Sequence, residues 1–425
     1  MNAYRQFIFK DYNLDLSSKT LSLTYGYDDE LEFSERYKFD FPFQQSLNVE
    51  AVDIACQNLF FMAGVSYYKM YLAPEIVINK GQLDQFSADF FSKTYQRGLG
   101  EFFYKNNLNP LTKVDFPANS EKVSVPTAMS LQGKLVAIGG GKDSLVSIEI
   151  LRQLPKVSTW SLGHKSQLTP LVERVGLPHL WVERQLDPAI SEHNANGAYN
   201  GHIPISAILA AVGTLVAVLS GKQDIVFSNE SSASEPSLEY RGVPINHQYS
   251  KSLEFEEDYQ SFLTHRLGES VRYYSLLRPL TELHIAQIFA QYFKKYKDVF
   301  SSCNRAFTQK STEIFWCGEC AKCAFAFLIL TPFISKNELE ELWGKNLLLD
   351  PVLEPIYKQL LGIEGDKPLD CVGEIKESRA AMLFAQEIYP ELAKYTFEVP
   401  EAYDWKELSP HAIPPEIYQE CCSFF

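Results

Sequence analysis

The chain has 425 residues, of which 46% are hydrophobic and 13% aromatic, and its formal net charge is −14 at pH 7. This length predicts two or three domains, and the apolar content is sufficient for a buried core and excludes a disordered chain. The acidic balance disfavours broad binding to nucleic acids, which requires basic surfaces.

The first fifteen residues, MNAYRQFIFKDYNLD, have no continuous apolar core and no small-residue cleavage site, so no signal peptide is predicted. The most membrane-like stretch is 203–219, IPISAILAAVGTLVAVL, which is near the lower length limit for a spanning helix. Because this stretch contains Pro204, Gly213 and other small residues, we expect a buried helix packed against a sheet. A soluble, cytoplasmic protein is therefore expected.

The chain divides into three regions by its pattern of residues. Residues 1–128 mix alternating stretches such as TLSLTYGY with helical ones, which indicates an α+β domain. Residues 129–300 alternate short apolar strands with helices, whereas residues 301–425 hold a cysteine cluster followed by helical segments. We expect three domains with these bounds, the third of them mainly helical.

The middle region is expected to form a mostly parallel sheet with right-handed crossovers, because strands and helices alternate along it. The expected strands are 135–139, 157–163, 179–184, 224–229 and 271–277, and the expected helices are 144–154, 166–176, 205–220 and 281–293. Ligands bind such sheets at the carboxyl ends of the strands. The stretch GGGKDS follows the first of these strands, where a ligand is expected.

The three glycines Gly139, Gly140 and Gly141 predict an anion-binding loop. Without Cβ atoms they can turn several backbone N–H groups inward at the start of a helix, which makes a site for phosphate or pyrophosphate. Ser144 can cap the helix or donate to the anion, and Lys142 adds a cation. Asp143 would repel bare phosphate, so it suggests Mg²⁺ or a structural role for its carboxylate. The alternative is a glycine-rich turn without a ligand.

The loop fits neither of two common glycine motifs. Asp143 follows the lysine where a Walker loop has Ser or Thr, and the dinucleotide fingerprint G-x-G-x-x-G/A is absent. The loop resembles the S-G-G-x-D-S signature of the PP-loop ATP pyrophosphatases, with Gly139 in place of the first serine. This resemblance implies an adenine nucleotide α-hydrolase-like domain that cleaves ATP between the α and β phosphates, with an adenylated intermediate and release of pyrophosphate.

A second candidate site is the cluster of Cys303, Cys317, Cys320 and Cys323, the last three in C-x-x-C-x-x-C spacing. Four thiolates suit tetrahedral Zn²⁺, and they could also hold an iron–sulfur cluster. The preQ0 synthases, another PP-loop family, carry a similar late cysteine group that binds zinc. The alternative without a metal is a set of cysteines packed on the apolar helix CAKCAFAFLIL.

Two polar segments, 193–206 and 228–259, are expected near the carboxyl edge of the sheet. Most of their residues fit an ordinary solvated loop. His247, Lys251 and Glu254 are better candidates, because the spacing of Lys251 and Glu254 would place them on one helical face with His247. Histidine is also the side chain best suited to proton transfer near neutral pH.

Several segments together resemble the MurL family, the UDP-N-acetyl-α-D-muramoyl-L-alanyl-L-glutamate epimerases of bacterial peptidoglycan synthesis. The resemblance covers about residues 1–390 and is carried by AGVSYYKMYLAPEI, GLGEFFYKNNL, GGGKDSLVSIEIL, SNESSASEPSLEYRGVPINHQYSKSLEFEEDY, SLLRPLTELHIAQIF, WCGECAKCAFAFLILTPF and LDCVGEIKESRAAM. It implies an isomerase that uses ATP and Mg²⁺ to convert the terminal L-glutamate of a UDP-muramoyl dipeptide to D-glutamate, releasing AMP and pyrophosphate.

The resemblance also implies roles for single residues. Gly139–Ser144 would hold the pyrophosphate end of ATP, Lys142 would offset the charge that develops as the α–β bond breaks, and Asp143 would contact Mg²⁺. The proton-transfer candidates are His202, His247, Lys251 and Glu254, with Cys303 as a thiol candidate that would then leave the metal cluster.

Other residues are candidates for substrate binding. Arg241 and Arg278 could grip the glutamate carboxylates or the UDP phosphates, with surface salt bridges as the alternative. The turn Gly98-Leu99-Gly100-Glu101 is a candidate contact of the N-terminal region with the substrate. The expected partner is this small molecule, with no nucleic acid and no membrane.

Two other functions stay open at this point. One is a PP-loop ligase or thiolase acting on a nucleobase or tRNA, similar to a preQ0 synthase, which the late cysteines favour and the acidic charge disfavours. The other is a module that binds ATP without turning it over, which the intact Lys142, Asp143 and Ser144 disfavour.

Overall fold

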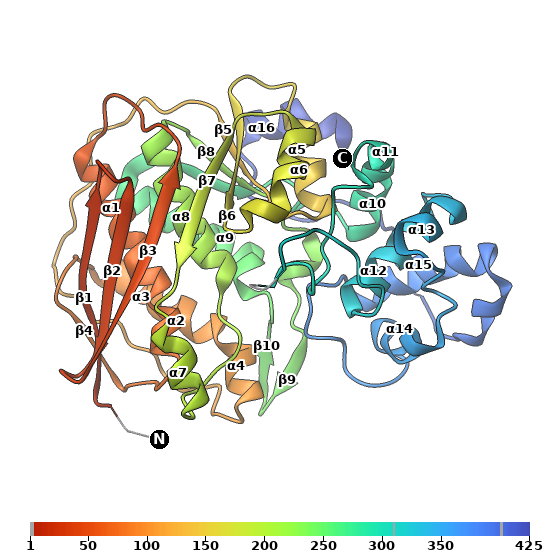
Figure 1. The fold of residues 1–425 in the computed structure, drawn as a ribbon, viewed down its shortest axis with the longest axis horizontal. Coiled ribbons are helices and arrows are strands. Elements are labelled where there is room, and N and C mark those ends of the chain that lie inside the picture. Colours follow the sequence, from red (N-terminus) through yellow and green to blue (C-terminus); the bar gives the residue numbers. More distant parts are fainter. Residues whose placement is uncertain (1–3, 309–310, 400–402) are drawn as a thin grey trace.

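The computed structural model describes residues 4–308, 311–399 and 403–425, and a single nine-stranded sheet runs through it (Figure 1). The strand order is β11-β8-β5-β6-β7-β3-β2-β1-β4. The strands are β1 (Gln6–Asp15), β2 (Thr20–Tyr27), β3 (Leu31–Asp40), β4 (Glu75–Ile78), β5 (Lys134–Ala137), β6 (Val157–Leu162), β7 (His179–Gln185), β8 (Asp224–Phe227) and β11 (Arg272–Ser275).

The half of the sheet formed by β11, β8, β5, β6 and β7 is parallel throughout, which confirms the expectation for the middle region. The expected helices are also present as α5 (Lys142–Leu151), α6 (Lys165–Val175), α8 (Ile205–Ser220) and α10 (Glu282–Ala290). From β5 the chain builds outward through β6 to β7, then returns to the other side of β5 to form β8 and β11. The strand order therefore reverses between β5 and β8, and ligands of open α/β sheets bind at such a point.

Alternating side chains of the parallel strands enter two hydrophobic cores. Leu135 and Ile225 face the core that contains α8, together with α1 (Val49–Ala63) and α9 (Leu253–Leu267). Their neighbours Val136 and Val226 face the core that contains α5, α6 and α10. Because both faces of β5 and β8 are covered, these two strands have apolar residues at consecutive positions rather than alternating ones.

The N-terminal strands belong to the same sheet as the parallel strands. β3 pairs antiparallel with β7, from Arg36 opposite Gln185 to Asp40 opposite Trp181, so the sheet contains strands from both sides of residue 128. At this seam Arg184 donates to the fully buried Glu35 carboxylate at 2.7 Å.

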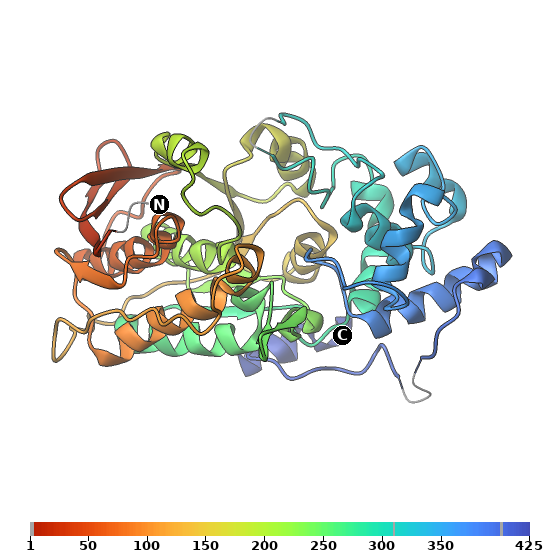
Figure 2. The same cartoon turned by 90° about the horizontal axis from the view of Figure 1, so that it is seen from below.

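After β11 the described ranges contain helices and long loops but no strand, and the helices after α10 are α11 (Phe293–Tyr296), α12 (Ala321–Leu330), α13 (Lys336–Trp343), α14 (Glu354–Leu360), α15 (Ile375–Ile388) and α16 (Pro415–Cys421). Figures 1 and 2 place α12–α15 at the end of the molecule opposite to β1–β4. α12 packs against α10, so the C-terminal helices extend the core on the α5 side of the sheet.

The apolar stretch 203–219 forms most of α8, which packs against α1 and the sheet as expected. Among the residues that the structure describes, no helix has both the length and the apolar character needed to span a membrane.

Candidate active site

The glycine loop joins β5 to α5 at the point where the strand order reverses. Gly140 has a φ of +92°, a conformation that favours glycine, and Gly141 is the N-cap of α5. The hydroxyl of Ser144 donates to the carbonyl of Gly141 at 3.1 Å and closes the first turn of the helix. The backbone thus has the strand–loop–helix form that presents N–H groups to an anion.

A second segment, residues 300–307, packs against this loop. The backbone N–H of Ser301 donates to the carbonyl of Gly140 at 2.9 Å. A Cβ on Gly140 would lie 2.5 Å from the Phe307 ring, whereas a Cβ on Gly139 would have no neighbour within 4 Å. The packing therefore requires glycine at position 140 but not at position 139.

Lys142 is buried and pairs with two carboxylates, those of Asp143 and Glu282. Burial alone would lower the pKa of Lys142, but these two negative charges outweigh it and raise the pKa above its usual value. Lys142 therefore stays positively charged at the start of α5.

A small cavity of about 80 Å³ opens beside Lys142. Its polar lining consists of Lys142, Asp143, Glu230, Lys251, Glu282, Ser302, Lys322 and Cys371. Glu230 follows β8 and Glu282 follows β11, so residues after three neighbouring parallel strands meet at one edge of the sheet.

Lys251 and Cys371 form a close polar pair in this cavity. The Lys251 ammonium donates to the Cys371 sulfur at 3.1 Å. Burial would raise the pKa of Cys371, but the charges of Lys251 and Lys322 and a hydrogen bond with His247 lower it to about 5. The thiol is therefore a thiolate at neutral pH.

His247 connects this pair to the N-terminal region. Its Nδ1 atom lies 2.5 Å from a carboxylate oxygen of Glu101, and His202 Nδ1 lies 3.3 Å from the same oxygen. Burial lowers the pKa of His247, but hydrogen bonds with Cys371 and Glu101 outweigh it and raise the pKa to about 9. Burial, followed by the charge of His247, lowers the pKa of His202 to about 4. At neutral pH His247 is charged and His202 is neutral.

Two glycines allow Glu101 to approach the histidines. Gly98 ends α3 (Gln85–Gly98), and Gly100 begins α4 (Gly100–Lys105). A Cβ on Gly98 would lie 2.6 Å from Pro204, and one on Gly100 would lie 3.2 Å from Ile245. The glycine turn noted in the sequence therefore brings the N-terminal region against the polar segments that carry His202 and His247.

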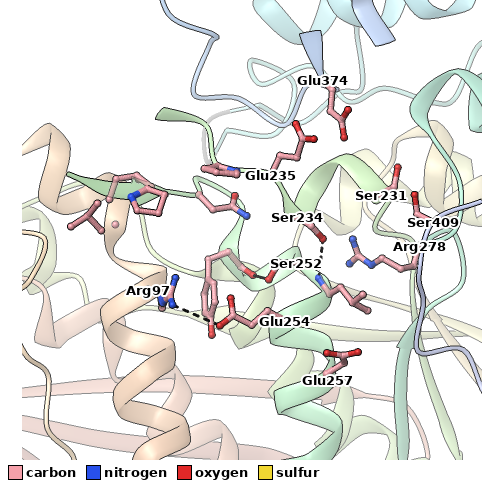
Figure 3. Close-up of a pocket in the computed structure, with 18 of the residues that line it drawn as sticks. Arg97, Ser231, Ser234, Glu235, Ser252, Glu254, Glu257, Arg278, Glu374 and Ser409 are labelled. Carbon is pink, nitrogen blue, oxygen red and sulfur yellow. Dashed lines mark hydrogen bonds and ion pairs between the residues drawn. The ribbon is translucent and has the colours of Figure 1, made fainter. Parts of the chain in front are cut away.

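Glu254 does not join the other proton-transfer candidates. Ser252 caps α9, so Lys251 precedes the helix and the expected common helical face is not formed. Glu254 instead pairs with Lys93 at 2.9 Å and lines a separate cleft of about 860 Å³ with Arg97 (Figure 3).

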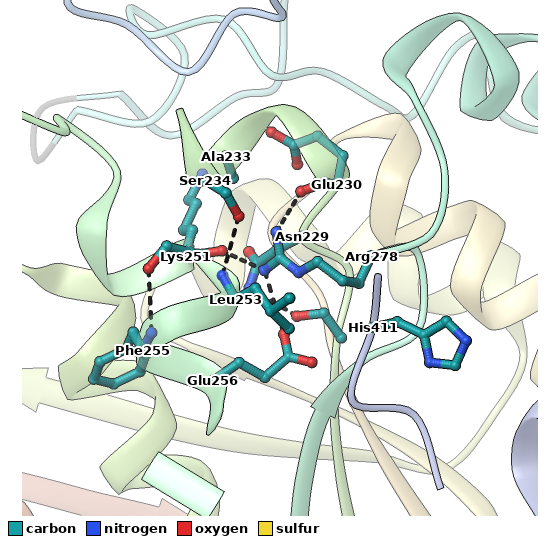
Figure 4. Close-up of polar contacts among 12 residues, drawn as sticks. Asn229, Glu230, Ala233, Ser234, Lys251, Leu253, Phe255, Glu256, Arg278 and His411 are labelled. Atoms are coloured by element: carbon teal, nitrogen blue, oxygen red, sulfur yellow. Dashed lines mark hydrogen bonds and ion pairs between the residues drawn. The ribbon is translucent and has the colours of Figure 1, made fainter. Parts of the chain in front are cut away.

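The two arginine candidates have structural contacts. Arg278 is 1% exposed, donates to the carbonyls of Glu230 and Lys251, and contacts Glu256 at 3.3 Å (Figure 4). It therefore holds the two segments that supply the cavity's Glu230 and Lys251. Arg241, which has a φ of +50°, lies at the tip of the hairpin formed by β9 (Leu238–Tyr240) and β10 (Val243–Ile245) and donates to Asn107 at 3.0 Å.

The four clustered cysteines converge in space. The Sγ–Sγ distances are 3.9 Å for Cys303–Cys320, 3.7 Å for Cys317–Cys323 and 3.6 Å for Cys320–Cys323. Four sulfurs around Zn²⁺ at a Zn–S distance of about 2.3 Å are about 3.8 Å apart in a tetrahedron. The arrangement therefore fits tetrahedral zinc, and Cys303 lies within this group rather than at the cavity.

Sequence reasoning missed Glu282, Ser302, Lys322 and Cys371 of the cavity lining, and it did not predict that Glu101 pairs with His247. Glu282 and Cys371 lie within the segments SLLRPLTELHIAQIF and LDCVGEIKESRAAM that carried the family resemblance, and this was the available signal. Cys371 has no motif around it, so the sequence gave no other indication that it lies in this cavity.

The fold and site define an α/β protein with a glycine-rich strand–loop–helix segment at the carboxyl edge of the parallel half of its sheet. The chain belongs to the MurL family: residues 1–276 match the MurL N-terminal domain, and residues 299–395 match the MurL C-terminal domain.

Three relatives bear the name UDP-N-acetyl-alpha-D-muramoyl-L-alanyl-L-glutamate epimerase. The protein of Xanthomonas oryzae pv. oryzae (strain MAFF 311018) is 38% identical, over 96% of this chain and 94% of its own length. Those of Micromonospora sp. (strain ATCC 39149 / NRRL 15099 / SCC 1413) and Salinispora tropica (strain ATCC BAA-916 / DSM 44818 / JCM 13857 / NBRC 105044 / CNB-440) are 36% and 37% identical, over 96% and 88% of this chain and 96% and 84% of their own lengths.

Proposed function

We propose that this protein epimerises the terminal L-glutamate of UDP-N-acetylmuramoyl-L-alanyl-L-glutamate to D-glutamate for peptidoglycan precursor synthesis, with ATP converted to AMP and pyrophosphate. Membership of the MurL family supports the substrate and the reaction. One observation carries the ATP-dependent mechanism: the glycine loop residues Lys142 and Asp143 line the same cavity as Lys251 and Cys371. Groups suited to activating a carboxylate and groups suited to moving a proton therefore share one cavity.

The proposed need for ATP follows from the acidity of the glutamate Cα–H. Removing this proton beside a free carboxylate would place a second negative charge next to the first. An acyl-adenylate has no such charge and can delocalise the new electron pair as an enolate. A base then removes the proton, a proton returns from the opposite face, and water cleaves the adenylate.

In this proposal the PP-loop-like segment Gly139–Ser144 holds the pyrophosphate end of ATP, and Lys142 stabilises the charge that develops on it. Asp143 is the proposed Mg²⁺ contact. Mg²⁺ is usually bound by one or two carboxylates together with substrate phosphates, and the partly exposed Asp143 beside Glu230 offers such a set. Bound Mg²⁺ would neutralise phosphate charge during adenylation.

We propose a structural Zn²⁺ for Cys303, Cys317, Cys320 and Cys323. Its place supports this role, because Cys303 lies in segment 300–307, which packs on the glycine loop, and Cys320 is the N-cap of α12. The site would fix this segment and α12, whose Lys322 lines the cavity.

The cleft of about 860 Å³ shown in Figure 3 is the proposed place for the nucleotide–sugar part of the substrate. The N-terminal region contributes Arg97 and Gly100 to this cleft, and the β9–β10 hairpin forms another part of its wall. Arg278 and Ser231 line the cleft, whereas the adjacent Glu230 lines the small cavity, so the two spaces adjoin the same segment.

The test incubates the protein with ATP, Mg²⁺ and the UDP-muramoyl-L-Ala-L-Glu substrate, and measures AMP, pyrophosphate and glutamate chirality. We expect D-glutamate and substrate-dependent AMP, and loss of both in Asp143→Asn. Asp298→Asn, at an exposed surface pair with Arg174, is the control and should keep full activity. AMP formed only with a nucleobase or tRNA would instead indicate a PP-loop ligase or thiolase, and no AMP under any condition would indicate a binding module.

A further inference from the structure

We propose that Cys371 is the catalytic base that removes the proton from the glutamate Cα, an inference that rests on the proposed function. Its sulfur lies in the cavity lined by Lys142 and Asp143, so it faces the place where the activated carboxylate would form. The Lys251 ammonium lies 3.1 Å from this sulfur, although the two residues are 120 positions apart in the chain.

The surroundings of Cys371 are arranged for a thiolate. Lys251, Lys322 and the charged imidazole of His247 supply positive charge, and Glu101 holds the Nδ1 atom of His247. Arg278 fixes the Lys251 segment through the Lys251 carbonyl. The lowered pKa of Cys371, about 5, agrees with this geometry. A thiolate in a partly exposed, electropositive place is the form of cysteine that reacts.

Three other candidates, Cys303, Glu254 and His202, are placed less well for this step. Cys303 lies 3.9 Å from Cys320, inside the group of four thiols. Glu254 lines the larger cleft and pairs with Lys93. His202 adjoins His247 and does not line the cavity that contains Lys142 and Asp143.

The proposed step balances as follows. The Cys371 thiolate takes the Cα proton, so that an S–H bond forms, the Cα–H bond breaks, and the electron pair moves into the enolate of the acyl-adenylate. Water gives a proton to the opposite face of the enolate. The hydroxide left behind is neutralised by the proton that the Cys371 thiol releases through His247, and the thiolate is restored.

The test compares Cys371→Ala and Cys371→Ser with the wild-type protein in D₂O, with ATP, Mg²⁺ and the dipeptide substrate. In the wild-type protein we expect D-glutamate with deuterium at Cα. In both variants we expect AMP formation to continue, because the adenylate still forms and is hydrolysed back to L-glutamate. D-Glutamate formation and Cα deuteration should fall at least about 100-fold, which is typical for loss of a general base.

The ratio of D-glutamate to AMP separates a catalytic role from a structural one. A ratio that stays unchanged in folded variants would overturn the proposal, whether both products fall equally or neither falls. A covalent acyl-Cys371 adduct found by intact mass would also overturn it. Cys422→Ala, at an exposed cysteine, is the matched control and should leave the ratio unchanged. If the wild-type protein makes no D-glutamate, the proposed function itself fails, which is a distinct result.

Discussion

The imidazole of His247 and the carboxylate of Glu101 lie 2.5 Å apart, although 146 residues separate them in the sequence. Gly98 and Gly100, at both sides of Leu99, pack closely against Pro204 and Ile245, and this close approach brings Glu101 to His247. Through this ion pair, the Glu101 carboxylate of the N-terminal region helps to raise the pKa of His247.

Glu101→Gln should shift the pH dependence of epimerisation. The pKa of His247 is raised to about 9, so the charged form that supports the Cys371 thiolate is lost as the pH rises through about 9. Removing the Glu101 charge lowers the pKa of His247 toward its usual value of about 6.5, and the alkaline limb should move down by about one unit or more. The acid limb, set by Cys371 near pH 5, should move little.

The measurement for Glu101→Gln is the rate of D-glutamate formation between pH 5 and about pH 10, with Glu269→Gln at an exposed position as control. His247 also makes the stability of the protein depend on pH. Because its pKa in the folded state lies above the value in the unfolded state, its contribution to the free energy of unfolding is fully present below about pH 6.5 and is lost as the pH rises through about 9. An alkaline limb that stays in place would contradict the coupling of Glu101 to His247.

Gly139→Ser and Gly140→Ala should have opposite outcomes. A side chain at 139 meets no neighbour within 4 Å and adds one hydroxyl donor, so Gly139→Ser should keep AMP formation and its apparent KM for ATP or improve that KM. At 140 the positive φ and the Phe307 ring oppose any Cβ, and Gly140→Ala should lose about 1–3 kcal/mol of stability together with most AMP formation. Kinetics of AMP release and thermal melting test both, and a tolerated Gly140→Ala would refute the loop geometry.

Metal analysis should find one Zn²⁺ per chain, and Cys317→Ser should lose it. Because the cluster segment bonds to the glycine loop through Ser301 and Gly140, loss of zinc should reduce AMP formation as well as lower the melting temperature by about 5–10 °C. Cys422→Ser is the control at an exposed thiol. Iron in place of zinc would contradict the assignment of a zinc site. An unaltered melting curve in a Cys317→Ser protein that has lost its metal would contradict the structural role of that site.

Glu35→Ala should destabilise the junction of β3 and β7. It leaves the Arg184 guanidinium, whose side chain is 10% exposed, without its 2.7 Å partner, which costs about 3–5 kcal/mol. Glu32→Ala on the same strand removes the exposed pair with Lys10 and should cost under about 1 kcal/mol. Urea unfolding of both variants measures the difference, and equal effects would show that the buried pair does not hold the seam.

Local patterns predicted much of the parallel half of the sheet. Its strands are short apolar runs between helices, and the glycine loop was placed correctly because it follows the first of them. The pairing of β3 with β7 had no such signature, because an antiparallel contact between distant segments depends on the whole core rather than on neighbouring residues.

The candidate site was predicted only in part for the same reason. His202, His247 and Lys251 were found by residue type within polar segments. Cys371 was missed because only the folded chain brings it to Lys251, and Glu254 was grouped wrongly because the helix begins after Lys251 rather than before it.

The shared sheet has a consequence for cutting the chain. A fragment beginning at residue 129 would carry β7 as an unpaired edge strand and would uncover the side of α8 that packs on α1. Exposed strand edges and apolar helix faces are templates for aggregation. We therefore expect separately expressed fragments 1–128 and 129–425 to precipitate alone and to become soluble only when they are synthesised together and can complement each other.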